Sequence, residues 1–113
     1  MISLDPTTMG ERENYKFLTG TIVPRPIAIV SSISNEGVVN IAPFSYFTIV
    51  SANPPMIAVS VQRRDGHKKD TSQNILDSRE FVVHITDELN AVDANQTAAE
   101  LPSNVSELEV SDF

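Results

Sequence analysis

The chain has 113 residues, of which 41% are hydrophobic, and a formal net charge of −7. This length is typical of one domain with a modest buried core, and the apolar share excludes a disordered chain. An acidic chain is a poor generic partner for nucleic acid or an anionic membrane, so we expect neither as a partner.

The N-terminal part of the chain is predicted to form a short helix over residues 9–18. A pair of threonines upstream can supply its cap, and Gly20 is expected to close it. Pro24 and Pro26 then break any helix and hold the chain extended, with Arg25 between them.

Five short segments rich in β-branched residues are predicted to be strands. They cover residues 27–34, 38–41, 46–51, 56–61 and 81–85. Pro43 is expected to interrupt the pattern as an edge, a bulge or a loop, because proline cannot donate to a sheet ladder. Closely spaced strands leave no room for helical crossovers, so we expect a mostly β barrel or sandwich with one or two accessory helices.

Two further helices are predicted, over residues 72–77 and 87–99, with Asp87 near the N-cap of the second. All of the net charge comes from residues 87–113, which contain acidic residues and no basic one. This segment is interpreted as a solvated acidic helix and tail, with a contact to a basic partner surface as the alternative.

The loop at residues 63–71, Arg-Arg-Asp-Gly-His-Lys-Lys-Asp-Thr, holds four of the eight basic residues and leads into a predicted helix. Backbone N–H groups at a helix start carry partial positive charge, and the basic side chains add full charge. The loop therefore predicts a receptor for an anion such as a phosphate. A solvated basic surface loop is the alternative interpretation.

Several common site types are excluded by the sequence. The four glycines form neither a Walker nor a dinucleotide fingerprint, and there is no Gly-x-Ser-x-Gly. Cysteine is absent, and His67 and His84 are not spaced as a metal pair, so we expect no metal and no disulfide. The first 20 residues lack the apolar core of a signal peptide, so we expect a cytoplasmic protein. With no strong acid, base or nucleophile, chemistry is expected to come from a bound cofactor.

A set of ordered motifs then resembles a known family. They are Pro24-Arg-Pro-Ile-Ala-Ile-Val-Ser-Ser, Asn40-Ile-Ala-Pro-Phe-Ser-Tyr-Phe, Asn53-Pro-Pro-Met-Ile, the basic loop, Asn74-Ile and Glu80-Phe-Val-Val-His-Ile. Together they resemble the flavin reductase-like proteins of the FMN-binding split barrel, in particular the flavoredoxin-like and nitrilotriacetate monooxygenase reductase-component proteins. The resemblance implies an antiparallel split β-barrel. Members of this family run well past residue 113, so we expect residues 1–113 to be a single domain that is incomplete relative to them.

The resemblance also implies which residues hold FMN. The ring and ribityl chain would lie near Asn40, Ala42, Pro43, Phe44, Ser45 and Phe47. The phosphate would be bound by Arg63, Lys69 and Thr71, with Asp70 and Asn74 ordering the loop. Arginine can grip a phosphate with two N–H bonds, lysine adds a point charge, and a threonine hydroxyl can donate. The alternatives are that the phenylalanines are barrel core and that Asp70 only caps the helix.

The implied activity is that of a homodimeric, NAD(P)H-dependent FMN reductase, an oxidoreductase whose reduced flavin would pass to a partner oxygenase. No side chain is expected to act as a catalytic acid or base. Two alternatives use the same fold: a non-enzymatic FMN-binding electron carrier, and a truncated barrel that only dimerises.

Overall fold

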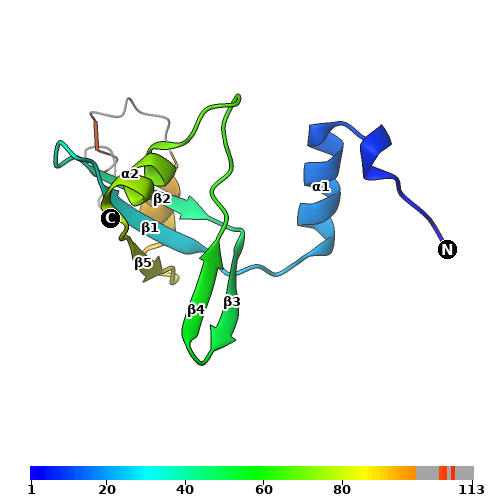
Figure 1. Cartoon of the computed structure of the whole chain (residues 1–113). Coiled ribbons are helices and arrows are strands. Elements are labelled where there is room, and N and C mark those ends of the chain that lie inside the picture. The colour runs from blue at the N-terminus through cyan, green and yellow to red at the C-terminus, as the bar shows by residue number, and fades with distance from the viewer. Residues whose placement is uncertain (99–104, 107, 109–113) are drawn as a thin grey trace.

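The structure is a computed structural model that describes residues 1–98, 105, 106 and 108 (Figure 1). The elements in chain order are η1 (Pro6–Thr8), α1 (Glu11–Thr21), β1 (Ala28–Ile33), β2 (Val39–Phe44), β3 (Phe47–Ala52), β4 (Pro55–Val59), α2 (Asp70–Ser78), β5 (Val82–Ile85) and α3 (Ala91–Gln96). Every helix in this part of the chain is too short or too polar to cross a bilayer.

The strands form two antiparallel sheets. One is three-stranded, in the order β2-β1-β5, and the other is the two-stranded ribbon β3-β4. In the larger sheet, Val30 of β1 lies opposite Ala42 of β2 and Val83 of β5. The prediction of a mostly antiparallel β fold with short accessory helices is therefore confirmed.

The core forms on both faces of β1, which explains its nearly continuous apolar sequence. Successive side chains of a strand point to opposite faces. Ala28 and Val30 pack with Phe44 on the face covered by α2, while Ile29 packs on the other face against Ala94 of α3. Figure 1 shows α2 in front of the sheet and α3, drawn in orange, behind it. The sheet is thus a middle layer between two short helices.

β2 continues through Pro43, so of the three alternatives expected there, an edge, a bulge or a loop, the structure shows the edge. Pro43 lies opposite Ile29 in the register, and the strand continues to Phe44. The ladder tolerates the proline because β2 is an edge strand of the described sheet, where a missing N–H need not remove a bond to a neighbour.

α1 also extends further than predicted, through Gly20 to Thr21. The hydroxyls of Thr19 and Thr21 donate to carbonyls four residues earlier, each at 2.8 Å. Arg25 then donates to the carbonyl oxygens of Thr19, at 2.9 Å, and Ile22. A basic side chain on the last carbonyls stabilises a helix C-terminus, so α1 ends at Thr21, one residue beyond the glycine, with its end bound by Arg25.

The third helix is shorter than predicted and begins at Ala91. Asp87 and Asn90 close a turn before it, each backbone N–H donating to the other's side-chain oxygen at 2.9 Å. Asp87 therefore belongs to this turn and is not the N-cap residue. The expected helix end at Ala99, and most of the tail, lie outside the described residues.

Candidate functional site

The start of α2 is built without a side-chain cap. Lys69 is the N-cap residue and makes no side-chain hydrogen bond to the first turn. A lysine ammonium has no acceptor, so it cannot satisfy the backbone N–H groups that a Ser, Thr, Asp or Asn cap would bind. Asp70 is the first helical residue rather than the cap. The positive end of the helix is thus available to an external acceptor.

Two buried side-chain hydrogen bonds fix α2 on the sheet. The hydroxyl of Thr71 donates to Asn40 Oδ1 of β2 at 2.5 Å, and Asn74 Nδ2 donates to Ser32 Oγ of β1 at 3.2 Å. All four side chains are less than a tenth exposed. Ile75 adds an apolar contact with the core. Satisfied buried polar pairs of this kind specify one orientation, so the first turn of α2 is held in a defined place beside β2.

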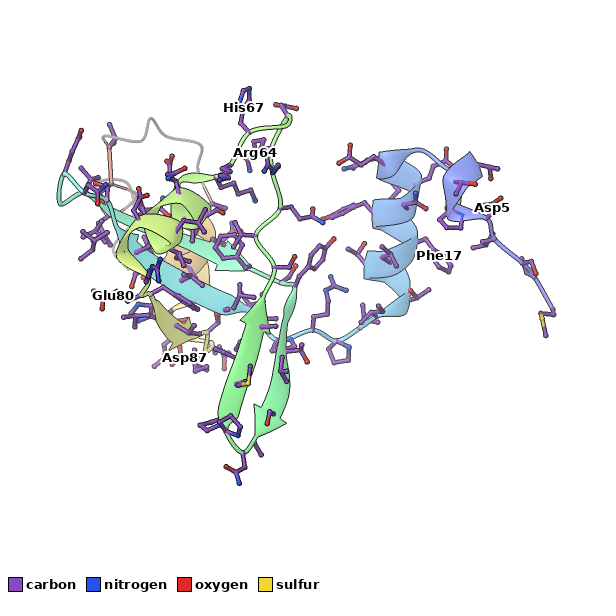
Figure 2. All side chains as sticks on the ribbon, in the orientation of Figure 1. Asp5, Phe17, Arg64, His67, Glu80 and Asp87 are labelled. Carbon is purple, nitrogen blue, oxygen red and sulfur yellow. The ribbon has the colours of Figure 1, made fainter. Side chains whose placement is uncertain are left out.

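The basic loop preceding α2 contains a tight hairpin. The backbone N–H of Arg64 donates to the carbonyl of His67 at 2.8 Å, and the reverse bond is 2.9 Å long. Asp65 and Gly66 between them have φ angles of 50° and 78°. Two central residues with positive φ define a type I′ turn, for which Asp-Gly is a favoured sequence. Figure 2 shows Arg64 and His67 at the end of this loop.

A cavity of about 370 Å³ lies between β2, the hairpin and the start of α2. This volume falls at the lower end of the range for small-molecule sites. The described residues that line it come from four segments of the chain: Asn40, Ala42, Pro43, Phe44, Arg64, Asp65, His67, Lys68, Lys69, Asp70, Thr71, Thr97 and Ala98.

The cavity brings together most of the residues that the sequence indicated. Seven of them line it: Asn40, Ala42, Pro43, Phe44, Lys69, Asp70 and Thr71. The other four, all in the described part of the chain, lie outside the lining. Ser45 lies between β2 and β3, and Phe47 packs against the core. Arg63 donates to the carbonyl oxygen of Gly66 at 3.4 Å, a long hydrogen bond. Asn74 binds Ser32 of β1 and so fixes α2 on the sheet.

Six lining residues had not been assigned to the site individually: Arg64, Asp65, His67, Lys68, Thr97 and Ala98. For the first four, the basic loop itself carried the signal. The Asp-Gly pair predicts a type I′ turn. In that turn the partner of His67 is Arg64, and Arg63 lies one residue outside the pair. The last two reach the cavity through the packing of α3 and carry no local signal. Thr97 is 1% exposed.

Phe44 joins the core to the cavity. Its side chain is buried with Ala28 and Val30, and it also forms part of the cavity lining. The Nζ atom of Lys69 lies 5.5 Å from the centroid of its ring, within the range of a cation–π contact. The ring therefore helps to place the ammonium group at the start of α2.

Among the described residues, the cavity lining carries more positive than negative charge. Its cationic side chains are Arg64, Lys68 and Lys69, and its carboxylates are Asp65 and Asp70. The hydroxyl of Thr71 is directed to Asn40 rather than into the cavity. The groups that can bind an anion here are therefore the cations and the backbone N–H groups of the first helical turn.

The sequence and the fold were compared with those of known proteins. Residues 19–113 match the family of the flavin reductase like domain. The Bacillus subtilis protein YwrF is 47% identical over 100 residues, which cover 88% of this chain and 49% of that protein. The chain thus spans about half the length of the curated relatives it matches.

Two solved structures share the fold. Nitrilotriacetate monooxygenase component B from Bacillus cereus superposes with a TM-score of 0.94 at 55% identity, covering 99% of this chain and 55% of that one. A split barrel domain protein of the flavin reductase type from Shewanella frigidimarina gives a TM-score of 0.76 at 17% identity, covering 94% of this chain and 52% of that one. The second likeness concerns the fold alone and identifies it as the split barrel.

Proposed function

The chain belongs to the flavin reductase-like family, and we propose that it binds FMN with the phosphate at the start of α2. The observation that carries this proposal is the uncapped first turn of α2, which opens on a cavity whose described lining residues include three cations and two carboxylates. A helix start of this kind is a ready-made phosphate site.

Three groups near that turn fit a phosphate monoester. The Lys69 ammonium lies beside the helix start, and the backbone N–H groups of Asp70 and Thr71 belong to its first turn. Charge-assisted hydrogen bonds from such donors are about twice as strong as neutral ones. The edge of β2 at Ala42, Pro43 and Phe44 forms the adjoining wall and is the natural position for the rest of the flavin.

The proposed reaction is the reduction of the flavin by NAD(P)H. A bound flavin supplies the hydride-accepting chemistry. The residues of this chain would bind the phosphate, orient the ring beside β2 and exclude water from one side of it. No side chain of the cavity needs to act as an acid or a base. Nitrilotriacetate monooxygenase component B shares 55% identity with this chain, which favours a role in supplying reduced flavin to an oxygenase.

We also propose that the chain forms a homodimer through the β3-β4 ribbon. Ile49 and Ile57 are cross-strand partners there and are 79% and 49% exposed, and Val50 and Met56 beside them are also exposed. Figure 1 shows the ribbon projecting away from the larger sheet. An exposed apolar ribbon of this kind marks an interaction surface. Sedimentation of the chain should give the mass of a dimer, and a monomer at micromolar concentration would exclude this interface.

The test of the flavin site compares FMN with riboflavin, which lacks the phosphate. The protein should bind FMN more tightly by about 10- to 150-fold, the equivalent of a charge-assisted hydrogen bond of about 1.5–3 kcal/mol. Equal affinities would refute a phosphate site at α2. Steady-state oxidation of NADH or NADPH then separates the reductase from a carrier, because a carrier would bind FMN without turnover. Failure to bind either flavin would leave only the dimerisation module.

A further inference from the structure

The cavity contains two separate sets of anion-binding groups. The first is the start of α2 with Lys69, which the proposed function assigns to the flavin phosphate. The second is the hairpin, where Arg64 and His67 line the same cavity from the preceding part of the basic loop. Figure 1 shows that the loop carrying the hairpin extends beyond α2. A phosphate monoester at the helix start is assigned to the first set alone.

The hairpin geometry places Arg64 and His67 side by side. They are the paired residues of an antiparallel bridge and exchange both of their backbone hydrogen bonds. Residues directly opposite in such a pair lie on one face with their Cβ atoms about 4.5–5.5 Å apart. The type I′ turn at Asp65-Gly66 fixes this arrangement without any ligand. The two side chains thus form one recognition unit that is organised in advance.

The chemistry of this unit suits a phosphate. The guanidinium group of arginine presents planar, paired N–H donors that match phosphate oxygens, and an imidazole ring adds a further N–H donor. Lys68 follows directly in the lining and raises the local positive charge. Asp65 in the turn is the counter-charge in this part of the cavity.

We propose that Arg64 and His67 bind a second phosphate, the one attached to the adenosine of a dinucleotide. This inference rests on the proposed function, because it takes the start of α2 to be occupied by the flavin phosphate. Two kinds of adenosine phosphate fit: the pyrophosphate of FAD or NADH, and the 2′-phosphate of NADPH. In either case the hairpin would distinguish a dinucleotide from a mononucleotide.

The experiment titrates the protein by calorimetry with ADP and with 2′,5′-ADP, neither of which contains a flavin. At least one of them should bind, and Arg64→Ala should weaken that binding by about tenfold or more, as for a lost charge-assisted hydrogen bond. His67→Ala should weaken it in the same direction. Arg12→Ala is the matched control, because it removes the same charge from α1, which does not line the cavity. Binding of ADP alone identifies the pyrophosphate, and preference for 2′,5′-ADP identifies the 2′-phosphate.

Two outcomes would overturn the inference: neither nucleotide binds the wild-type protein, or Arg64→Ala binds both as tightly as wild type does. Titration with FMN separates these results from failure of the proposed function. Arg64→Ala should weaken FMN binding by a clearly smaller factor than it weakens ADP binding, because the flavin phosphate is assigned to α2 and Arg64 adds only its charge to that end of the cavity. A loss of FMN binding equal to the loss of ADP binding would place Arg64 at the flavin phosphate and refute the assignment of two sites.

Discussion

Replacing Thr71 with valine tests which group of this residue faces the ligand. The hydroxyl donates to Asn40 Oδ1 at 2.5 Å, and Thr71 is 2% exposed. Valine keeps the branched shape but removes the donor from a buried acceptor, which costs about 1–3 kcal/mol. Against a total stability of about 5–15 kcal/mol for a domain, this is a large fraction. The backbone N–H of residue 71 remains in the variant, so FMN affinity should change by less than about threefold.

The assay pairs urea unfolding with FMN titration of the same samples. Thr21→Val is the matched control, since Thr21 is exposed at the end of α1, away from the cavity and from the β3-β4 ribbon, and its loss should change the unfolding free energy by less than about 0.5 kcal/mol. The opposite pattern would refute the reasoning. If Thr71→Val kept wild-type stability and lost FMN affinity by about 10- to 150-fold, the hydroxyl would bind the phosphate directly.

Three further predictions concern Lys69, the buried Asn74–Ser32 pair and the cap of η1. Lys69→Ala should weaken FMN by about 1.5–3 kcal/mol and leave riboflavin unchanged, and an equal loss for both ligands would remove Lys69 from the phosphate site. Ser32→Ala removes the acceptor of the buried Asn74 amide and should lower the unfolding free energy by about 1–3 kcal/mol, which an unchanged urea midpoint would contradict. Hydrogen bonds from the Thr7 hydroxyl and backbone N–H lower the pKa of Asp5, so the cap of η1 is present at neutral pH and is lost as the pH falls through the lowered pKa. The Thr7 amide resonance should shift in that acid range, and a resonance that follows the ordinary aspartate pKa would exclude the cap.

The strands were predictable because they depend on local pattern. β1 contains three β-branched residues, Ile29, Val30 and Ile33, and the structure buries its first half on both faces between α2 and α3. The helix ends were not predictable in the same way. α1 passes Gly20, and Arg25, which lies between Pro24 and Pro26, binds its last carbonyls. That contact depends on the path of the chain after the helix, which no local propensity describes.

The cavity was predictable in its segments and less so in its residues. The basic loop and the Asn40 to Phe44 segment both line it. Both could be recognised in the sequence, the first by its cluster of cations and the second by its proline. The orientation of each side chain depends on register. The type I′ turn directs Arg64 into the lining and leaves Arg63 out of it, and a shift of one residue in a hairpin reverses which side chains share a face. Thr97 enters only through tertiary packing.

The most direct test of the flavin site is a crystal structure of the protein with FMN. We expect the phosphate to lie against the backbone N–H groups of Asp70 and Thr71, with Lys69 Nζ within hydrogen-bond distance. We also expect the Thr71 hydroxyl to donate to Asn40 in the complex, as it does here. A phosphate bound elsewhere, with the start of α2 occupied by solvent, would contradict the central claim.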